Sequence, residues 1–311
     1  MRFSKKSIVE VSLFLVAIIW GLNLSVIKTS LTELKAFPFN ALRFIFATAL
    51  MWTVLLWKRQ QFAIPKKDWM PLLGLALLGN LIYQVLFIIG VDFTQAANAA
   101  VMLGTIPVWV AIFSHFGNFE KMNAYKSIGV TFAFLGIVII MAGGKQVFSF
   151  TSNTVKGDLM IILAAMVFAG YTILSRSFLK RYTPIQFTTI MTTIGCIALV
   201  IIGLPGLMQT DWQSVSFVAY GGAIYSGLLA IGAAFLIWNY GLQTVGAVYT
   251  STFQNLVPVL GLFFGIVLLN ENLTLLQYLG SALVIAGIVL ARWKGYAAER
   301  RNKEKESARI P

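Results

Sequence analysis

The sequence is short of the residues that carry most enzyme chemistry. Its 311 residues include one cysteine, one histidine and only 11 aspartates and glutamates. The single cysteine, Cys196, excludes an intramolecular disulfide, and we interpret it as a small hydrophobic residue within an apolar run. We interpret the lone His115 as a packed or hydrogen-bonded group. No metal-ligand spacing, phosphate-binding glycine loop or catalytic triad is present, so we expect no cofactor, no metal and no enzyme activity.

Charge is also scarce. Charged residues make up 11% of the chain and hydrophobic residues 58%, and the mean hydropathy is +0.81, which excludes a soluble globular domain. A bilayer core about 30 Å thick takes about 20 helical residues, and lipid does not tolerate open sheet edges, so we predict an all-α membrane protein with ten transmembrane helices. The predicted spans cover residues 8–28, 39–57, 70–91, 95–116, 125–142, 157–176, 185–205, 217–240, 246–268 and 274–293.

The basic residues predict the orientation in the bilayer. If the N-terminus lies in the cytoplasm, nineteen of the 24 lysines and arginines fall on the cytoplasmic side. The other five are Lys28, Lys35, Arg43, Lys145 and Lys156. Both termini are therefore expected in the cytoplasm of a cell membrane, taken to be a bacterial inner membrane. The net charge of +13 then needs no nucleic acid to explain it, and residues 295–311 are interpreted as a basic cytoplasmic tail.

The chain contains an internal repeat. A shift of 151 positions aligns two sets of residues in one register: Gly90, Ala96, Pro107, Glu120, Gly129 and Gly136 with Gly241, Ala247, Pro258, Glu271, Gly280 and Gly287. A shift of 148 matches Trp20 with Phe168 near the start of each copy. We therefore predict two five-helix repeats, residues 1–146 and 147–294.

Five spans per copy is an odd number, so the second repeat enters the membrane from the opposite side. Glu120 and Glu271 then lie on opposite faces, each just before a helix, where we interpret them mainly as helix-start caps. Two inverted halves have two packings of similar energy, one open to each side, and this symmetry is typical of transporters.

Four stretches resemble the repeats of EamA-type carriers of the drug/metabolite transporter superfamily. They are "IIWGLN", "LRFIFA", "AANAAVMLGTIPVWVAIFSHFGNFE" and "STFQNLVPVLGLFFGIVLLNENLT". The resemblance covers residues 8–293, and one departure is "FGNFEK", where the family more often has a Gly-Glu or Arg-Glu pair. It implies a carrier of small metabolites, often amino acids moved outward, while small relatives expel cationic drugs through a membrane-embedded glutamate.

Polar residues deep in the predicted spans are neutral. No carboxylate lies at mid-depth, and Glu10 falls only two positions inside the first span. A buried carboxylate is what would hold an organic cation in lipid, so its absence disfavours cation exchange. Amides, hydroxyls and aromatic rings are instead expected to line a substrate cavity: Trp20, Asn23, Asn80, Tyr83, Gln84, Asn98, Thr105, Tyr171, Trp238, Gln254 and Asn255.

Two prolines occupy matching places in the repeats. Pro107 and Pro258 each remove a backbone donor in the middle of a predicted span, and matched helix breaks point toward a binding site. Lys28 and Arg43, near the outer end, could attract a substrate carboxylate, although snorkelling of their side chains to the interface is the commoner explanation.

These features predict a transporter that works by rocking of its halves. The expected substrate is a small zwitterionic or aromatic metabolite, amino acids first, with export as the expected direction. The alternatives are a proton-coupled exporter of drugs or toxic cations and, less favoured, a membrane-embedded lipid-modifying enzyme. Small-molecule substrate and lipid are the expected partners, and the chain is expected to be a monomer or homodimer.

Overall fold

The computed structural model describes residues 5–62, 64–94, 96–117, 124–143 and 152–269, and short pieces within 274–290 (274–276, 278–280, 282–283, 286–287 and 290). Every regular element in these residues is helical, as predicted. Glu120, Glu271, the basic tail 295–311 and much of the tenth predicted span lie outside the described residues.

The helices correspond closely to the predicted spans. In chain order they are α1 Lys5–Ser30, α2 Ala36–Trp57, η1 Lys66–Asp68, α3 Trp69–Ala76, η2 Leu77–Ile82, α4 Tyr83–Phe93, α5 Ala96–Leu103, α6 Ile106–Phe116, α7 Ala124–Gly143, α8 Ser152–Phe178, α9 Pro184–Gln209, α10 Phe217–Tyr225, η3 Ser226–Ala233, α11 Ala234–Val245, α12 Ala247–Ser251, η4 Thr252–Asn255 and α13 Leu256–Leu269.

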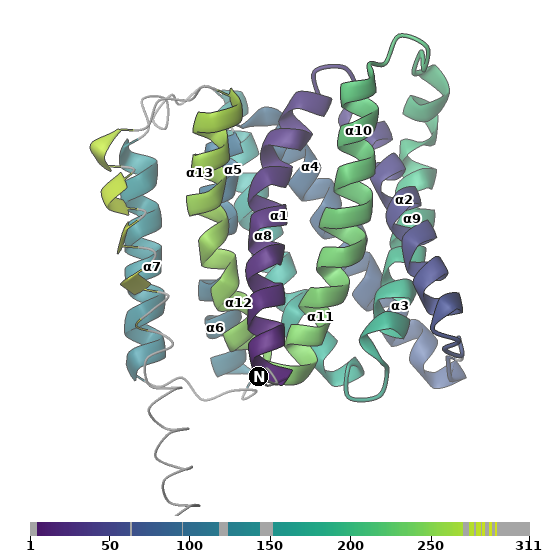
Figure 1. Cartoon of the computed structure of the whole chain (residues 1–311), viewed down its shortest axis with the longest axis horizontal. Helices are drawn as coiled ribbons and strands as arrows, with labels where there is room; N and C mark the ends of the chain where they lie inside the picture. Colours follow the sequence, from purple (N-terminus) through teal and green to yellow (C-terminus); the bar gives the residue numbers. More distant parts are fainter. Residues whose placement is uncertain are drawn as a thin grey trace, which may run out of the picture.

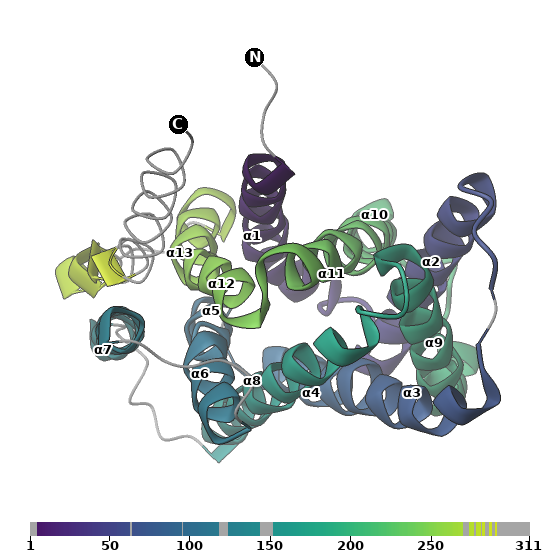
Figure 2. The ribbon, with the colours of Figure 1, turned by 90° about the horizontal axis from the view of Figure 1, so that it is seen from below.

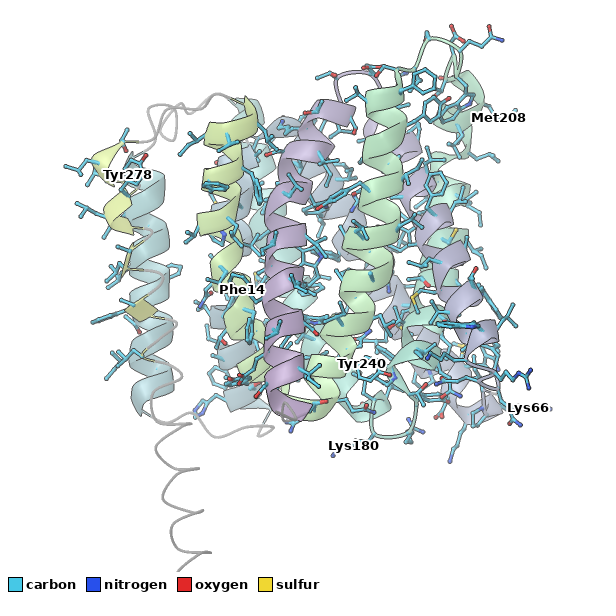
Figure 3. All side chains as sticks on the ribbon, in the orientation of Figure 1. Phe14, Lys66, Lys180, Met208, Tyr240 and Tyr278 are labelled. Carbon is cyan, nitrogen blue, oxygen red and sulfur yellow. The ribbon has the colours of Figure 1, made fainter. Side chains whose placement is uncertain are left out.

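The outside of the bundle is suited to lipid. Seven helical stretches in the described residues are long and apolar enough to cross a membrane, and two shorter apolar helices accompany them. Large apolar side chains such as Phe14 and Met208 are exposed on the outer surface (Figure 3). The helices are therefore those of a multi-pass membrane protein, and the full count of ten stays a prediction.

The helices run side by side, and most of them surround the centre of the molecule (Figures 1 and 2). α2 packs on α9, α4 on α8, and α1 on α13. α1 begins at the lower face in Figure 1, whereas α8 ends at that face, next to Lys180 in Figure 3. The first helix of each predicted repeat thus crosses the bundle in the opposite direction.

Two predicted spans are interrupted helices. Residues 96–116 form α5 and α6, separated by a turn at Gly104 and Thr105, and the matching second-half span contains the 3-10 segment η4 between α12 and α13. Pro107 and Pro258 lie in the first turn of α6 and α13. A proline is tolerated there because the first turn has no intrahelical acceptor for its missing N–H. Pro107 therefore begins a new helix segment after a turn, whereas Pro258 follows a 3-10 segment within one continuous helical stretch.

π-helical segments occupy matching positions in two other spans. η2 interrupts the helix from α3 to α4, and η3 interrupts the helix from α10 to α11. Leu77 and Ser226, where these segments begin, are 149 positions apart, close to the repeat shift found in the sequence. π-Helical turns leave main-chain groups without regular helical partners and often occur at functional sites. Hydropathy does not reveal them, because their residues are as apolar as their neighbours.

Candidate functional site

A pocket lies between the two halves of the bundle. Its lining comes from ten elements: Trp20, Asn23 and Leu24 of α1, Arg43 of α2, Tyr83, Gln84 and Phe87 of α4, Leu103 of α5, Ile106 of α6, Phe168 of α8, Ala230 and Ile231 of η3, Phe235 of α11, Gln254 of η4 and Val257 of α13. The cavity has a volume of about 40 Å³ in this conformation. It holds about three waters, so a metabolite needs side chains or helices to move.

Aromatic rings from both halves gather at this pocket: Trp20, Tyr83, Phe168 and Phe235 line it, and Trp238 packs against Trp20 and Phe168. We call Trp20, Tyr83, Phe168, Phe235 and Trp238 the aromatic cluster. The ring of Phe168 lies 4.9 Å from Tyr83, 6.1 Å from Phe235 and 5.8 Å from Trp238, measured between ring centroids. Such tilted contacts favour a packed, defined arrangement. The cluster offers ring faces to an apolar side chain or an ammonium group.

Hydrogen bonds join α1 to the π-helical segment η3. The indole Nε1 of Trp20 donates to the carbonyl oxygen of Ala230 at 2.8 Å, and the hydroxyl of Ser226 donates to Oδ1 of Asn23 at 2.6 Å. Tyr225, just before η3, donates from its hydroxyl to the carbonyl oxygen of Ile19 at 3.1 Å. Trp20 therefore satisfies a main-chain carbonyl within the π-helical segment while its ring lines the pocket.

Arg43 is the charged residue of the pocket lining. Its side chain is 2% exposed, and its Nη1 donates to Oδ1 of Asn40 at 3.3 Å. Its guanidinium carbon lies 5.6 Å from the ring centroid of Phe39 and 5.8 Å from that of Phe87. Among the described residues no carboxylate pairs with it, and its Nε has no hydrogen-bond partner. The expectation that Arg43 snorkels to the interface was wrong.

Gly227 allows η3 to pack closely against the main chain of Arg43. A Cβ placed on Gly227 of η3 would come within 2.5 Å of the carbonyl oxygen of Arg43, so only glycine lets η3 approach α2 this closely. Gly79 of η2 has the same role for Tyr171, whose ring would lie 2.1 Å from such a Cβ. The two π-helical segments thus each pack a glycine against a neighbouring helix.

The predicted site residues divide into two groups. Trp20, Asn23, Tyr83, Gln84 and Gln254 line the pocket.

The other predicted residues are buried outside that lining, except for one whose side chain lies outside the described part of the structure. Asn80, Thr105, Tyr171, Trp238 and Asn255 are buried, and the side chain of Asn98 lies outside the described residues. Thr105 donates to the carbonyl oxygen of Met102 at 2.7 Å, which closes the break before α6. Both amide atoms of Asn80 and Oδ1 of Asn255 are buried without a partner in the described structure.

Sequence reasoning missed the second helix and several apolar rings. The predicted cavity was walled by the first, third, fourth, sixth, eighth and ninth spans, and it omitted α2 with Arg43. A usable signal was present, since Arg43 is the one basic residue well inside a predicted span. Phe168 was matched with Trp20 by the repeat shift but was not chosen, because phenylalanine in an apolar helix has no polar atom to distinguish it.

The lower face of the bundle is bridged between the halves. Asp68 accepts hydrogen bonds from Nη1 of Arg181 at 2.7 and 2.9 Å and from the hydroxyl of Tyr182 at 2.7 Å. Burial and the hydrogen bond to Asp68 raise the pKa of Tyr182 to about 12. Thr183 caps α9 through the main-chain N–H of Gln186 and also donates to Oε1 of Gln60 at 2.5 Å. These contacts join the segment after α2 to the loop between α8 and α9.

The upper face has its own bridges. The carboxylate of Glu33 accepts hydrogen bonds from the main-chain N–H and the hydroxyl of Ser216, both at 2.7 Å. These bonds lower the pKa of Glu33, the main-chain bond contributing most. Thr94 donates to Oδ1 of Asp158 at 2.7 Å. Hydrogen bonds therefore join the two halves at both faces of the bundle.

The fold is that of a multi-pass helical membrane protein with a central pocket, and known proteins show its family. The model of the EamA-like transporter family matches the chain twice, over residues 7–142 and 155–293. The chain belongs to this family and is a membrane transporter.

Relatives and a solved structure agree with this assignment. The chain is 26% identical to the uncharacterized transporter YoaV of Bacillus subtilis (strain 168), over 88% of this chain and 93% of that one. It is 29% identical to an uncharacterized transporter of Archaeoglobus fulgidus, over 87% of this chain and 94% of that one. A solved crystal structure, 18% identical, covers 92% of this chain and 97% of its own with a TM-score of 0.74, which shows a shared fold.

Proposed function

We propose that this transporter moves small zwitterionic metabolites, first of all amino acids with bulky apolar or aromatic side chains, across the cell membrane by alternating access. The observation that carries the proposal is the central pocket, in which the aromatic cluster meets amides and one arginine. Rings accept an apolar side chain, and the polar groups accept the charged ends of a zwitterion. Export as the direction rests on the family resemblance.

The proposed architecture is two inverted five-helix repeats, 1–146 and 147–294, with both termini in the cytoplasm. The opposite directions of α1 and α8, the matched π-helical segments and the matched interruptions near Pro107 and Pro258 support it. Cysteines introduced in place of Glu120 and Glu271 test it by labelling in intact cells with a membrane-impermeant thiol reagent. Only the second site is expected to react from outside, and reaction of both from the same side contradicts the inversion.

The proposed cycle alternates between two sets of bridges. Asp68 with Arg181 and Tyr182 holds the lower face, which the distribution of basic residues places in the cytoplasm. Glu33 with Ser216, and Thr94 with Asp158, hold the upper face. Opening one face breaks its bridges while the other set stays closed, so the pocket is exposed to one side at a time.

The cation-exporter alternative fits this pocket less well. An organic cation would meet the positive charge of Arg43, and no aspartate or glutamate is among the described lining residues to oppose it. Glu10 lies near the beginning of α1, where it accepts a hydrogen bond from the hydroxyl of Tyr249. Glu10→Gln is therefore expected to leave amino-acid transport largely intact, whereas a proton-coupled cation exporter built on Glu10 would lose protection against toxic cations.

Proteoliposomes test the substrate directly. Purified protein is reconstituted, and uptake of radiolabelled amino acids is compared with empty vesicles, with and without an imposed proton gradient. Uptake of phenylalanine, tryptophan or leucine above the empty-vesicle level is the expected result. Failure to transport any amino acid, combined with transport of an organic cation, overturns the proposal, and the response to the proton gradient distinguishes coupled transport from facilitated diffusion.

A further inference from the structure

Two buried polar atoms on the pocket residues have no partner in the described structure. One is Nε of Arg43, which only donates, and the other is Oε1 of Gln84, which only accepts. Arg43 and Gln84 are each 2% exposed. Buried polar groups in proteins are nearly always hydrogen-bonded, so an unmet donor and an unmet acceptor on one pocket point to a ligand that supplies both complements.

We propose that Arg43 and Gln84 form a subsite that recognises the two charged groups of an α-amino acid. The guanidinium of Arg43 binds the substrate carboxylate, and Oε1 of Gln84 accepts a hydrogen bond from the substrate ammonium group. The aromatic cluster receives the side chain. This subsite rests on the proposed function, because it identifies the part of an amino acid that the pocket distinguishes from other small molecules.

The two residues are held close together by a third. Asn40 accepts from Nη1 of Arg43 at 3.3 Å, and its Nδ2 donates to the carbonyl oxygen of Gln84 at 3.4 Å. An α-amino acid carries its carboxylate and ammonium on the same carbon, so its receptor needs a donor and an acceptor a few ångströms apart. Asn40 links the guanidinium of Arg43 to the main chain of Gln84, and both side chains line the same pocket, so the donor and the acceptor are near one another.

The surroundings of Arg43 suit a substrate anion better than a protein one. Its guanidinium carbon lies within about 6 Å of two ring centroids, a cation–π distance, and these rings help to hold the cation away from the interface. A charged side chain inside a membrane protein requires a counter-charge or a functional role. With no carboxylate paired to Arg43 in the described residues, a substrate carboxylate provides that counter-charge, and a bidentate pair adds geometric selectivity.

The ammonium group has neutral partners. Among the described lining residues there is no aspartate or glutamate, so carbonyl oxygens and ring faces are what an ammonium meets. Gln84 and Phe87 are three positions apart on α4 and lie on one face of that helix. Tyr83 and Phe168 add ring faces with centroids 4.9 Å apart. A neutral acceptor with aromatic faces binds an ammonium moderately, which suits a carrier that must release its cargo.

Three probes separate the two halves of the subsite. L-Phenylalanine carries both charged groups, 3-phenylpropanoate lacks the ammonium, and phenethylamine lacks the carboxylate. Their dissociation constants are measured by titration calorimetry on the full-length protein in detergent. The variants are Arg43→Gln, Arg43→Lys and Gln84→Leu, and the matched controls are Arg59→Gln and Gln213→Leu, which alter exposed residues outside the pocket lining.

The expected pattern is selective loss. Arg43→Gln weakens binding of phenylalanine and 3-phenylpropanoate by at least about tenfold, because it removes the partner of a buried charge. It does not weaken binding of phenethylamine and should strengthen it, because the positive charge that opposes the amine is gone. Gln84→Leu weakens phenylalanine and phenethylamine but not 3-phenylpropanoate. Both controls bind like the wild type. If Arg43→Gln does not fold, the same measurements on Arg43→Lys test the proposal. This variant keeps the charge but loses the paired donors, so it is expected to weaken binding of only the two probes that carry a carboxylate.

Other outcomes overturn the subsite, and they are distinguishable from failure of the proposed function. Equal binding of phenylalanine by wild type and Arg43→Gln, equal loss of all three probes, or no binding of either carboxylate probe by the wild type contradicts it. If proteoliposomes transport phenylalanine with the same KM after Arg43→Gln, the function stands and the subsite fails. If no amino acid is transported but 3-phenylpropanoate binds in an Arg43-dependent way, the function fails and the carboxylate half of the subsite stands.

Discussion

Trp20 and Phe168, which are 148 positions apart and matched by the internal repeat, meet edge to face in the middle of the molecule. Their ring centroids are 6.2 Å apart and the rings are inclined at 87°. One residue comes from α1 and the other from α8, the first helix of each predicted repeat. Equivalent residues of the two halves therefore touch at the centre, and a motion that separates the halves there must separate this pair.

Replacing Trp20 with phenylalanine tests the hydrogen bond that joins α1 to η3. Trp20→Phe keeps a ring in the pocket but removes the hydrogen bond to the carbonyl oxygen of Ala230. We expect a loss of about 1 kcal/mol in the free energy of unfolding and a raised KM for transport. Trp212→Phe is the matched control, because Trp212 donates to the carbonyl oxygen of Leu207 away from the pocket. It lowers stability similarly and leaves KM unchanged; a changed KM in both variants contradicts a local role for Trp20.

Gly227→Ala tests the close approach of η3 to α2. The new methyl group would lie 2.5 Å from the carbonyl oxygen of Arg43 and 2.7 Å from Cβ of Phe46, so the helices must separate. Overpacking of this kind costs about 1–3 kcal/mol, which a thermal unfolding measurement in detergent detects. Gly221→Ala, where a Cβ meets nothing within 4 Å, is expected to be neutral or stabilising. Equal unfolding temperatures for both variants would count against the packing argument.

Asp68→Asn is expected to loosen the lower face. The change keeps the size of the side chain but removes the ion pair with Arg181 and weakens the bond to Tyr182. The equilibrium should shift toward the state open at that face. In a Cys196→Ala background, a cysteine at Phe235 of the pocket should react several-fold faster with a thiol reagent added to that side.

The matching control for Asp68 is Asp211→Asn on the other face. Asp211 is exposed and accepts from the nearby main-chain N–H of Gln213, within its own loop. This variant should label at the wild-type rate. A wild-type rate for Asp68→Asn as well would show that the lower bridge does not hold the closed state.

The lowered pKa of Glu33 predicts that acid weakens the hydrogen bonds at the upper face. The hydrogen bonds from Ser216 lower the folded-state pKa of Glu33 below its ordinary value of 4.5. The stabilisation that these bonds give the folded protein is therefore complete above pH 4.5. It is lost as the pH falls through the lowered folded-state pKa. Unfolding temperatures measured from pH 6 to pH 3 should fall less steeply for Glu33→Gln than for the wild type.

The partner residue supplies the control for that measurement. Ser216→Ala removes the hydroxyl donor and the cap at Ala219, but it leaves the main-chain N–H bonded to Glu33. It should lower stability at every pH while most of the acid dependence remains. An unchanged pH profile for Glu33→Gln would show that Glu33 does not contribute to it.

Much of the fold is visible in the sequence, because crossing a bilayer requires a long apolar helix wherever it occurs. The predicted limits of α2 and α9 lie within a few residues of those observed. The π-helical segments η2 and η3 were not predictable. Their backbone pairing differs from that of an α-helix, but their side chains follow the same apolar pattern.

The sequence predicted which types of residue form the candidate site, but it identified only some of the individual residues. Asn23, Gln84 and Gln254 line the pocket. An amide at depth in a membrane helix must face protein or water. The same reasoning selected Asn80 and Asn255, which are buried elsewhere in the bundle. Polarity predicts that a side chain turns inward, and it does not say which inward direction the side chain takes.

The sequence by itself determined that this protein is a duplicated helical membrane carrier, because hydropathy, repeat spacing and charge bias are properties of short segments read one at a time. Only the tertiary structure decided that Arg43 faces the pocket, that Gln84 is its neighbour, and that Trp20 binds the carbonyl oxygen of Ala230. Helices that are apolar on every side carry no internal signal for which face turns inward. That choice is made by packing against other helices, including the close approach that Gly227 permits.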